Sequence, residues 1–247
     1  MKRNVFFILC LLLLHFSVIA QIGNPYLIYQ SASNNAMFLN TKMAIQRSMS
    51  HSSSKTKNSN TTPLQNAKSY QKADLNFIPF ADVHTKVVGT IAKIMAQGDV
   101  SKISAYTQML DKENLLGKFN NLLQRYGFNS KNVGDVFAAY IILSWQAATG
   151  NDAAKSPNGI EIFRKQIQSS FAENGTISQY SNGQKQELTE TLAYIATLVT
   201  LANEELVKKG DVGAIQQSHK NIGQLTFKLV GMDVTKYQLN QSGFNSL

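Results

Sequence analysis

A shortage of cysteine sets the first limit on this sequence. The only cysteine, Cys10, lies within an apolar run close to the first residue. If that run is removed on export, the remaining chain has no thiol, which excludes disulfide bonds, a thiolate nucleophile and cysteine metal ligands. The folded part must then be held together by side-chain packing alone.

Several familiar catalytic patterns are missing as well. The four histidines include no pair spaced one helical turn apart, and no group of carboxylates has the spacing of a calcium loop. No HExxH, G-x-S-x-G elbow, phosphate-binding loop or dinucleotide-binding glycine pattern occurs. We therefore expect no metal and no cofactor, and the usual signals of serine hydrolases and nucleotide-dependent enzymes are lacking.

What the sequence does contain begins with an export signal. Positions 2 and 3 are basic, and they precede an apolar run over 5–19 that ends next to Ala20. This order predicts a secretory signal peptide over residues 1–20. The run is short for a membrane span and contains His15, so we expect cleavage after Ala20. The sequence thus predicts an exported protein, periplasmic or extracellular, without a transmembrane span after cleavage.

Residues 21–72 differ in composition from the rest of the chain. Their charged residues are all basic, and the first acid after the signal is Asp74. Residues 48–62 are polar and nearly free of aliphatic side chains, which predicts a disordered linker. One interpretation is a solvated tether; the other is a contact with a polyanion such as anionic lipid, wall polymer or nucleic acid. The residues available for that contact are Lys42, Arg47, Lys55, Lys57, Lys68 and Lys72.

From residue 73 onward the apolar residues recur at helical spacing. Asp82, Pro157 and Ser181 are predicted to begin helices, and Gly175 and Gly210 to end them. Residues 103–126 indicate two helices or one bent helix, and strands are at most marginal. The sequence predicts one all-α domain over 73–247, a single bundle of about six helices. The intervals with helical spacing are 83–95, 103–110, 115–126, 132–150, 160–171, 188–206 and 215–229.

A short repeat occurs at two helix junctions. Gly98-Asp99-Val100 and Gly210-Asp211-Val212 each follow one predicted helix and precede another. The repeat fits a duplicated helical hairpin. It also fits the ordinary chemistry of such junctions, where glycine ends one helix and aspartate caps the next.

Residues 132–150, NVGDVFAAYIILSWQAATG, form an apolar run that contains the only tryptophan. If Asn132 is the N-cap, the Asp135 carboxylate can return a hydrogen bond to the backbone of the cap and meet the positive end of the helix dipole. The apolar surface is too wide for a half-exposed helix and predicts a central one. We expect the indole nitrogen of Trp145 on a backbone carbonyl or at the domain edge. The alternative to these structural roles is a binding site formed by Asp135, Tyr140 and Trp145.

Two motifs carry a resemblance to a known family. They are Asn132, Val133, Asp135, Ala138, Ala139, Tyr140 and Trp145, and the closing Leu239-x-x-x-Gly243-Phe244. With them the chain resembles, from about Phe77 to Phe244, the bacterial exported family catalogued as domain of unknown function 6683 (DUF6683). The resemblance implies a helical domain whose best-marked element is 132–150, and it implies no activity.

Three functional hypotheses remain open. The favoured one is a non-enzymatic exported module that binds an unknown protein or envelope component. The second is a hydrolase of envelope polymer, which needs two carboxylates facing each other at about 5 to 10 Å. Asp82 and His84 do not supply an acid and base pair for it, because residues two apart point to different faces of a helix. The third is a peripheral binder of polyanions through residues 42–72.

Overall fold

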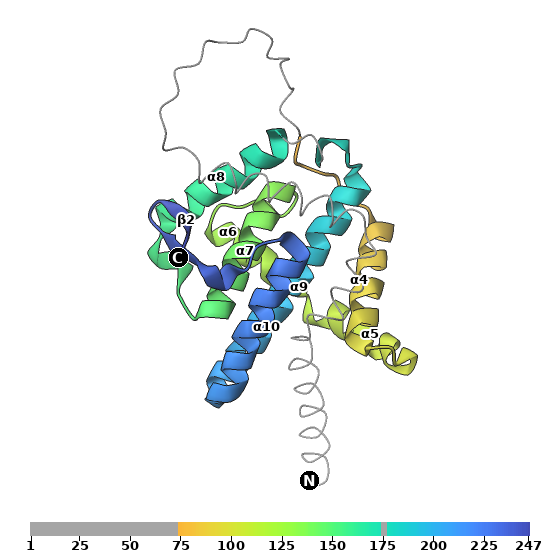
Figure 1. Ribbon diagram of the computed structural model, residues 1–247. Helices are drawn as coiled ribbons and strands as arrows, with labels where there is room; N and C mark the ends of the chain where they lie inside the picture. Colours follow the sequence, from red (N-terminus) through yellow and green to blue (C-terminus); the bar gives the residue numbers. More distant parts are fainter. Residues whose placement is uncertain (1–73, 174–176) are drawn as a thin grey trace.

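The computed structural model describes residues 74–173 and 177–247 (Figure 1). The predicted signal peptide 1–20, the basic segment 21–72 with its candidate polyanion contacts, and Gly175 lie outside the described residues. The described part is mostly helical, with seven α-helices, four short 3₁₀-helices and one β-hairpin. The predicted all-α class is therefore confirmed.

The helices follow the chain in the order that the apolar spacing predicts. The α-helices are α4 (Ala81–Ala96), α5 (Ile103–Glu113), α6 (Leu115–Arg125), α7 (Val133–Thr149), α8 (Pro157–Glu173), α9 (Asn182–Lys209) and α10 (Val212–Val230). The 3₁₀-helices are η1 (Val100–Lys102), η2 (Ala153–Lys155), η3 (Ile177–Gln179) and η4 (Val234–Lys236), and the strands are β1 (Tyr237–Asn240) and β2 (Gly243–Ser246). Residues 103–126 form two helices, because Asn114 takes a left-handed conformation at φ 46° between them.

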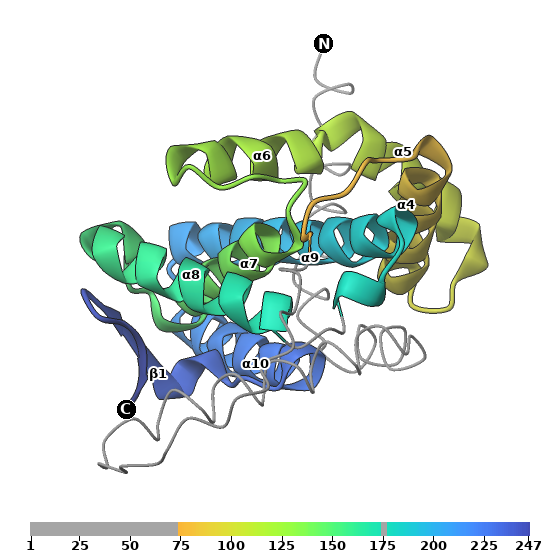
Figure 2. The same ribbon diagram turned by 90° about the horizontal axis from the view of Figure 1, so that it is seen from above.

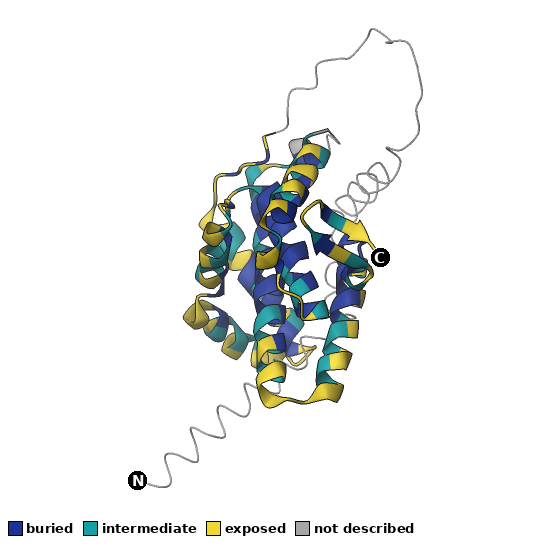
Figure 3. Cartoon of the chain, turned by 90° about the vertical axis from the view of Figure 1, so that its left-hand side faces the viewer, coloured by how far each residue is buried: buried dark blue, intermediate teal, exposed yellow. Residues whose placement is uncertain are grey.

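Two helices, α7 and α9, pack against each other in the centre of the domain. Figure 2 shows α6 on one side of this pair and α10 on the other, with α4 and α5 at one end and α8 at the other. Nearly every residue of α7 is buried, as is most of the amino-terminal two thirds of α9 (Figure 3). The central position predicted for 132–150 is therefore confirmed. Among the described helices, none combines the length and the apolar character needed to cross a bilayer.

Contacts at the helix ends explain where α9 and α4 begin and where α9 ends. Ser181 caps α9 by accepting from the Gln184 backbone, and the Gln184 side chain accepts from the Ser181 backbone in return. Gly210 ends α9 at φ 69°. The prediction that Asp82 caps α4 is wrong: the N-cap is Phe80, and Asp82 lies in the first turn. The cause is distant in sequence, because the Gln186 side chain binds both the N–H and the carbonyl of Phe80.

Both copies of the short repeat act as helix junctions. Asp99 caps η1 by accepting from the Ser101 backbone, and Asp211 caps α10 by accepting from the Ala214 backbone. Gly98 and Gly210 both have positive φ. The chemistry of an ordinary junction therefore accounts for both copies without invoking duplication.

The closing β-hairpin was not predicted, because its strands are only four residues long. The two strands pair antiparallel, with Leu239 opposite Phe244, and they lie against α8. Gly159 on α8 permits this approach, because a Cβ there would collide with the Asn240 carbonyl oxygen. The second sequence motif thus encodes a hairpin that covers one end of the helical core.

Candidate functional site

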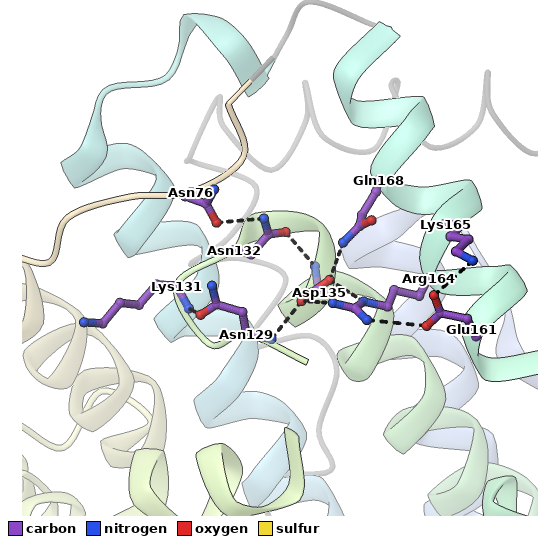
Figure 4. Close-up of polar contacts among 9 residues, drawn as sticks. All are labelled: Asn76, Asn129, Lys131, Asn132, Asp135, Glu161, Arg164, Lys165 and Gln168. Atoms are coloured by element: carbon purple, nitrogen blue, oxygen red, sulfur yellow. Dashed lines mark hydrogen bonds and ion pairs between the residues drawn. The ribbon is translucent and has the colours of Figure 1, made fainter. Parts of the chain in front are cut away.

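Asp135 is the third residue of α7 and is almost completely buried, with 1% of its surface exposed. Its backbone N–H donates to the Asn132 side-chain oxygen at 3.1 Å. The prediction that Asn132 caps this helix is confirmed. The Asn132 amide also donates to Asn76 at 3.0 Å, which links the cap to the segment that precedes α4 (Figure 4).

The Asp135 carboxylate accepts four hydrogen bonds from three partners. Arg164 on α8 donates from Nε and Nη2, each at 2.8 Å. The Gln168 side chain donates at 2.6 Å and the Asn129 backbone at 2.7 Å (Figure 4). The predicted return bond to the Asn132 backbone is wrong, because that N–H donates to the Asn129 carbonyl instead. Asp135 therefore fastens α7 to α8 and to the preceding loop.

The neighbours of this carboxylate explain how the pairing is held. Gly134 leaves room for Gln168, since a Cβ at position 134 would lie 2.9 Å from the Gln168 Cγ. The Arg164 guanidinium lies over the Phe128 ring at 4.8 Å and also meets Glu161 at 3.4 Å. Its hydrogen bonds to Asp135 raise the pKa of Arg164 above its ordinary value. The cluster is closed, because the carboxylate has as many donors as it has lone-pair sites.

Tyr140 and Trp145 lie further along α7 and have the contacts of core residues. Tyr140 is fully buried, which raises the pKa of its phenol, and its hydroxyl forms no well-aligned hydrogen bond although Ser144 is adjacent. The Trp145 indole N–H donates to the Tyr237 carbonyl at 2.9 Å, which confirms the expected partner type. The ring also packs edge-on against Phe244 at 5.7 Å. A binding role for Asp135, Tyr140 and Trp145 stays a prediction, and their observed contacts join helices and hairpin.

A cavity of about 140 Å³ lies on the other side of the 129–131 loop. Its walls come from the segment before α4, from α6, from the 130–131 loop, from α7 and from α9. The apolar lining residues are Phe77, Pro79, Leu116, Phe119, Val136 and Ala193, and the polar ones are Asn120, Ser130, Lys131, Thr189 and Glu190. Val136 directly follows Asp135 in the chain, so the closed cluster and the cavity share one turn of α7.

Glu190 supplies the only carboxylate among the residues that line this cavity. Its Oε2 lies 2.9 Å from His84 Nδ1 on α4, and its Oε1 accepts from the Gln186 amide at 2.8 Å. The Glu190 side chain retains 15% exposure. The carboxylate that contacts His84 is therefore Glu190, which lies 106 residues further along the chain, and not Asp82.

The Thr189 hydroxyl donates to the Lys185 carbonyl of its own helix, whereas the three remaining polar side chains at the cavity are not engaged. Among the described residues, the side chains of Lys131, Ser130 and Asn120 have no hydrogen-bond or ion-pair partner. Figure 4 shows the Lys131 side chain pointing away from Asp135. One ammonium, one hydroxyl and one amide are thus available at a concave surface with an apolar floor.

The segment before α4 forms one wall of the cavity and is held by polar contacts. The buried Lys185 ammonium donates to the carbonyls of Asp74 and Asn76, at 2.6 and 3.2 Å. The Phe77 N–H donates to the Lys131 carbonyl at 3.0 Å. Because Phe77 and Pro79 follow directly, these bonds fix the wall relative to α9 and to the 130–131 loop.

Comparison with known proteins places the chain in a family. A family model described as "Family of unknown function (DUF6683)" matches residues 1–246. The chain belongs to this family. None of the curated proteins and none of the solved structures matches the chain. The geometry of this DUF6683 member must therefore supply the functional argument.

Sequence reasoning found one polar residue of α7 and missed the cavity of this DUF6683 member. His84 and Glu190 lie on α4 and α9, and neither stands in a local motif. Lys131 and Ser130 occupy a loop that the apolar spacing does not mark. In residues 74–173 and 177–247, no three side chains of histidine, cysteine, aspartate or glutamate gather as metal ligands would.

Proposed function

We propose that this DUF6683 member is an exported, non-enzymatic binding module and that the cavity beside Glu190 is its binding site. The observation that carries the proposal is the set of unengaged polar groups at a partly apolar cavity. Ser130 and Asn120 are half-buried and Lys131 is exposed, and among the described residues none of the three side chains has a hydrogen-bond or ion-pair partner. They line a concave surface with an apolar floor, which is the arrangement of a ligand site.

The surface next to the cavity supports the same proposal. Ile78 and Phe80 flank the lining residue Pro79, and they are 68% and 46% exposed. Neither side chain is among the lining residues of the cavity. They add exposed apolar area on the segment that forms one cavity wall, and a partner larger than the cavity could bury it.

The acid and base groups at the cavity favour binding over hydrolysis. The His84 and Glu190 contact has the arrangement of a general base and its orienting carboxylate. Within the described contacts, however, no hydroxyl is hydrogen-bonded to the other ring nitrogen of His84. Glycoside hydrolysis requires a second acid facing the first, and the cavity lining contains Glu190 alone.

Export remains part of the proposal on the strength of the first 20 residues. We accordingly expect the ligand to be a component of the cell envelope. The basic residues between 42 and 72 would add a salt-sensitive attraction to a polyanion, because dissolved salt screens the interaction between charges in water.

The proposal is tested by capture from native envelope extract, with the full-length protein as bait. Replacing Asn120 on the cavity wall by tryptophan should block the cavity and remove the captured component. Lys220→Met, on the exposed face of α10, removes a charge far from the cavity and should leave capture unchanged. Capture that survives Asn120→Trp in a folded protein would place the binding surface elsewhere.

A further inference from the structure

We infer that the cavity recognises an apolar α-amino acid through both its ammonium and its carboxylate. This inference rests on the proposed binding function and names the ligand class. It follows from three features of one lining: an acid with spare acceptor sites, unengaged donors, and an apolar floor of limited volume.

Glu190 provides the site for the ammonium group. Each of its carboxylate oxygens accepts one hydrogen bond from the protein, from Gln186 and from His84. A carboxylate has about four lone-pair sites, so both oxygens retain acceptor capacity. The side chain is mostly buried, which makes a charge-assisted contact with an ammonium stronger than it would be in water.

Lys131, Ser130 and Asn120 provide the site for the carboxylate. Together they offer an ammonium, a hydroxyl and an amide N–H₂, all donors suited to a carboxylate. The Asp135 carboxylate does not compete for Lys131, because its donors are Arg164, Gln168 and Asn129 and the Lys131 side chain points away from it (Figure 4). Charges of both signs therefore line one cavity and leave a zwitterion as the complementary ligand.

The floor of the cavity sets the size of the ligand side chain. Phe119, Val136 and Ala193 are buried apolar residues from three different helices. A cavity of about 150 Å³ lined by apolar side chains accepts benzene. The 140 Å³ here also includes the space beside the polar lining, so the room over the floor suits side chains no larger than that of leucine or phenylalanine. A hydrocarbon without charged groups would displace water from the polar lining without replacing its hydrogen bonds, which opposes its binding.

The test is calorimetric titration of the full-length protein with L-leucine and with two analogues that each lack one charge. N-acetyl-leucine lacks the ammonium and leucinamide lacks the carboxylate. Loss of a charge-assisted contact should weaken each analogue at least tenfold relative to leucine. L-valine and L-phenylalanine extend the series of side-chain sizes.

Two variants assign each charge of the ligand to its residue. Glu190→Gln should weaken leucine and leucinamide and leave the already weakened N-acetyl-leucine unchanged. Lys131→Met should weaken leucine and N-acetyl-leucine and leave leucinamide unchanged. Lys220→Met is the matched control and should change none of the three affinities.

Two results would overturn the inference. One is equal binding of leucine and its analogues. The other is no binding of leucine, valine or phenylalanine. If Asn120→Trp still abolished capture from envelope extract, the proposed binding function would stand and only the ligand class would be rejected. Capture that persisted in Asn120→Trp would reject the cavity as the site in both proposals.

Discussion

Two polar regions meet at the 129–131 loop, and they differ in how completely their groups are paired. On one side the Asn129 N–H joins Arg164 and Gln168 in donating to Asp135, whose carboxylate is 1% exposed. On the other side Lys131 and Ser130 line a cavity without a described partner, and the Glu190 side chain keeps 15% exposure. A buried acid is thus no sign of a site by itself, because its partners decide whether it is structural or available.

The largest expected effect comes from breaking the closed region. Asp135→Ala leaves the Arg164 guanidinium, the Gln168 amide and the Asn129 N–H without their acceptor, so we expect a loss of about 3 to 5 kcal/mol in unfolding free energy. Contact of the carboxylate with the positive end of the helix dipole would alone account for up to about 1 kcal/mol. Urea unfolding measures the difference, and a loss near the smaller value would show that the Arg164 pairing adds little.

A smaller loss is expected where α7 meets the hairpin. Trp145→Phe keeps an aromatic ring against Phe244 but removes the donor to the Tyr237 carbonyl, so we expect a loss of about 1 to 2 kcal/mol. Thermal unfolding gives the stability, and hydrogen exchange at residues 237–246 should rise in the variant. Unchanged exchange there would mean that the indole bond does not anchor the hairpin.

Tyr140 tests whether the core around α7 tolerates the loss of a polar group. Its hydroxyl is buried without a well-aligned partner, so Tyr140→Phe should leave stability unchanged or raise it by up to about 1 kcal/mol. Capture of an envelope component should also be unchanged. If Tyr140→Phe were stable but no longer captured the envelope component, the binding site would be at Tyr140 on α7 and not at the cavity.

Lys131→Met should show the opposite behaviour to Asp135→Ala. Because Lys131 has no described ion-pair partner, the expected change in unfolding free energy is within about 0.5 kcal/mol. Urea unfolding measured beside Asp135→Ala gives the contrast directly. A loss comparable to that of Asp135→Ala would show that the open region is structural too.

The smallest effect concerns a third region, where α9 meets α10. Asn203 Oδ1 and His219 Nε2 are buried there without described partners, and burial lowers the pKa of His219. The unfolded chain therefore binds a proton at His219 more readily than the folded protein does, and stability should fall as the pH drops below about 6.5. His219→Gln should flatten this dependence in thermal melts between pH 5 and 8. An equal slope in both proteins would assign the dependence to other groups.

The sequence predicted those parts of the molecule that depend on local chemistry. The Asn132 cap, the Ser181 cap and the turn at Gly210 each involve residues within four positions of one another, and the wide apolar face of α7 is visible in its own spacing. Asp135 was correctly placed in the helix but given the wrong partner, because Arg164 lies on the following helix.

The parts that sequence reasoning missed depend on packing between distant elements. His84 meets Glu190 only because α4 lies beside α9, and no short motif records that arrangement. Phe80 replaced Asp82 as the cap of α4 for the same reason, since Gln186 fixes the Phe80 backbone. The hairpin was not predicted because its four-residue strands are too short to show a clear alternation of apolar and polar residues.

Lys185 gives the domain a mechanical anchor. Its ammonium holds the Asp74 and Asn76 carbonyls, and Gln186 in the next position of α9 holds Phe80. Tension applied to the chain ahead of residue 74 would reach the Lys185 contacts, and the Val133 N–H bond to the Leu75 carbonyl, before it reached α4. Phe77 and Pro79 lie between the two holding points, so the cavity wall would keep its shape while the chain ahead of it is pulled.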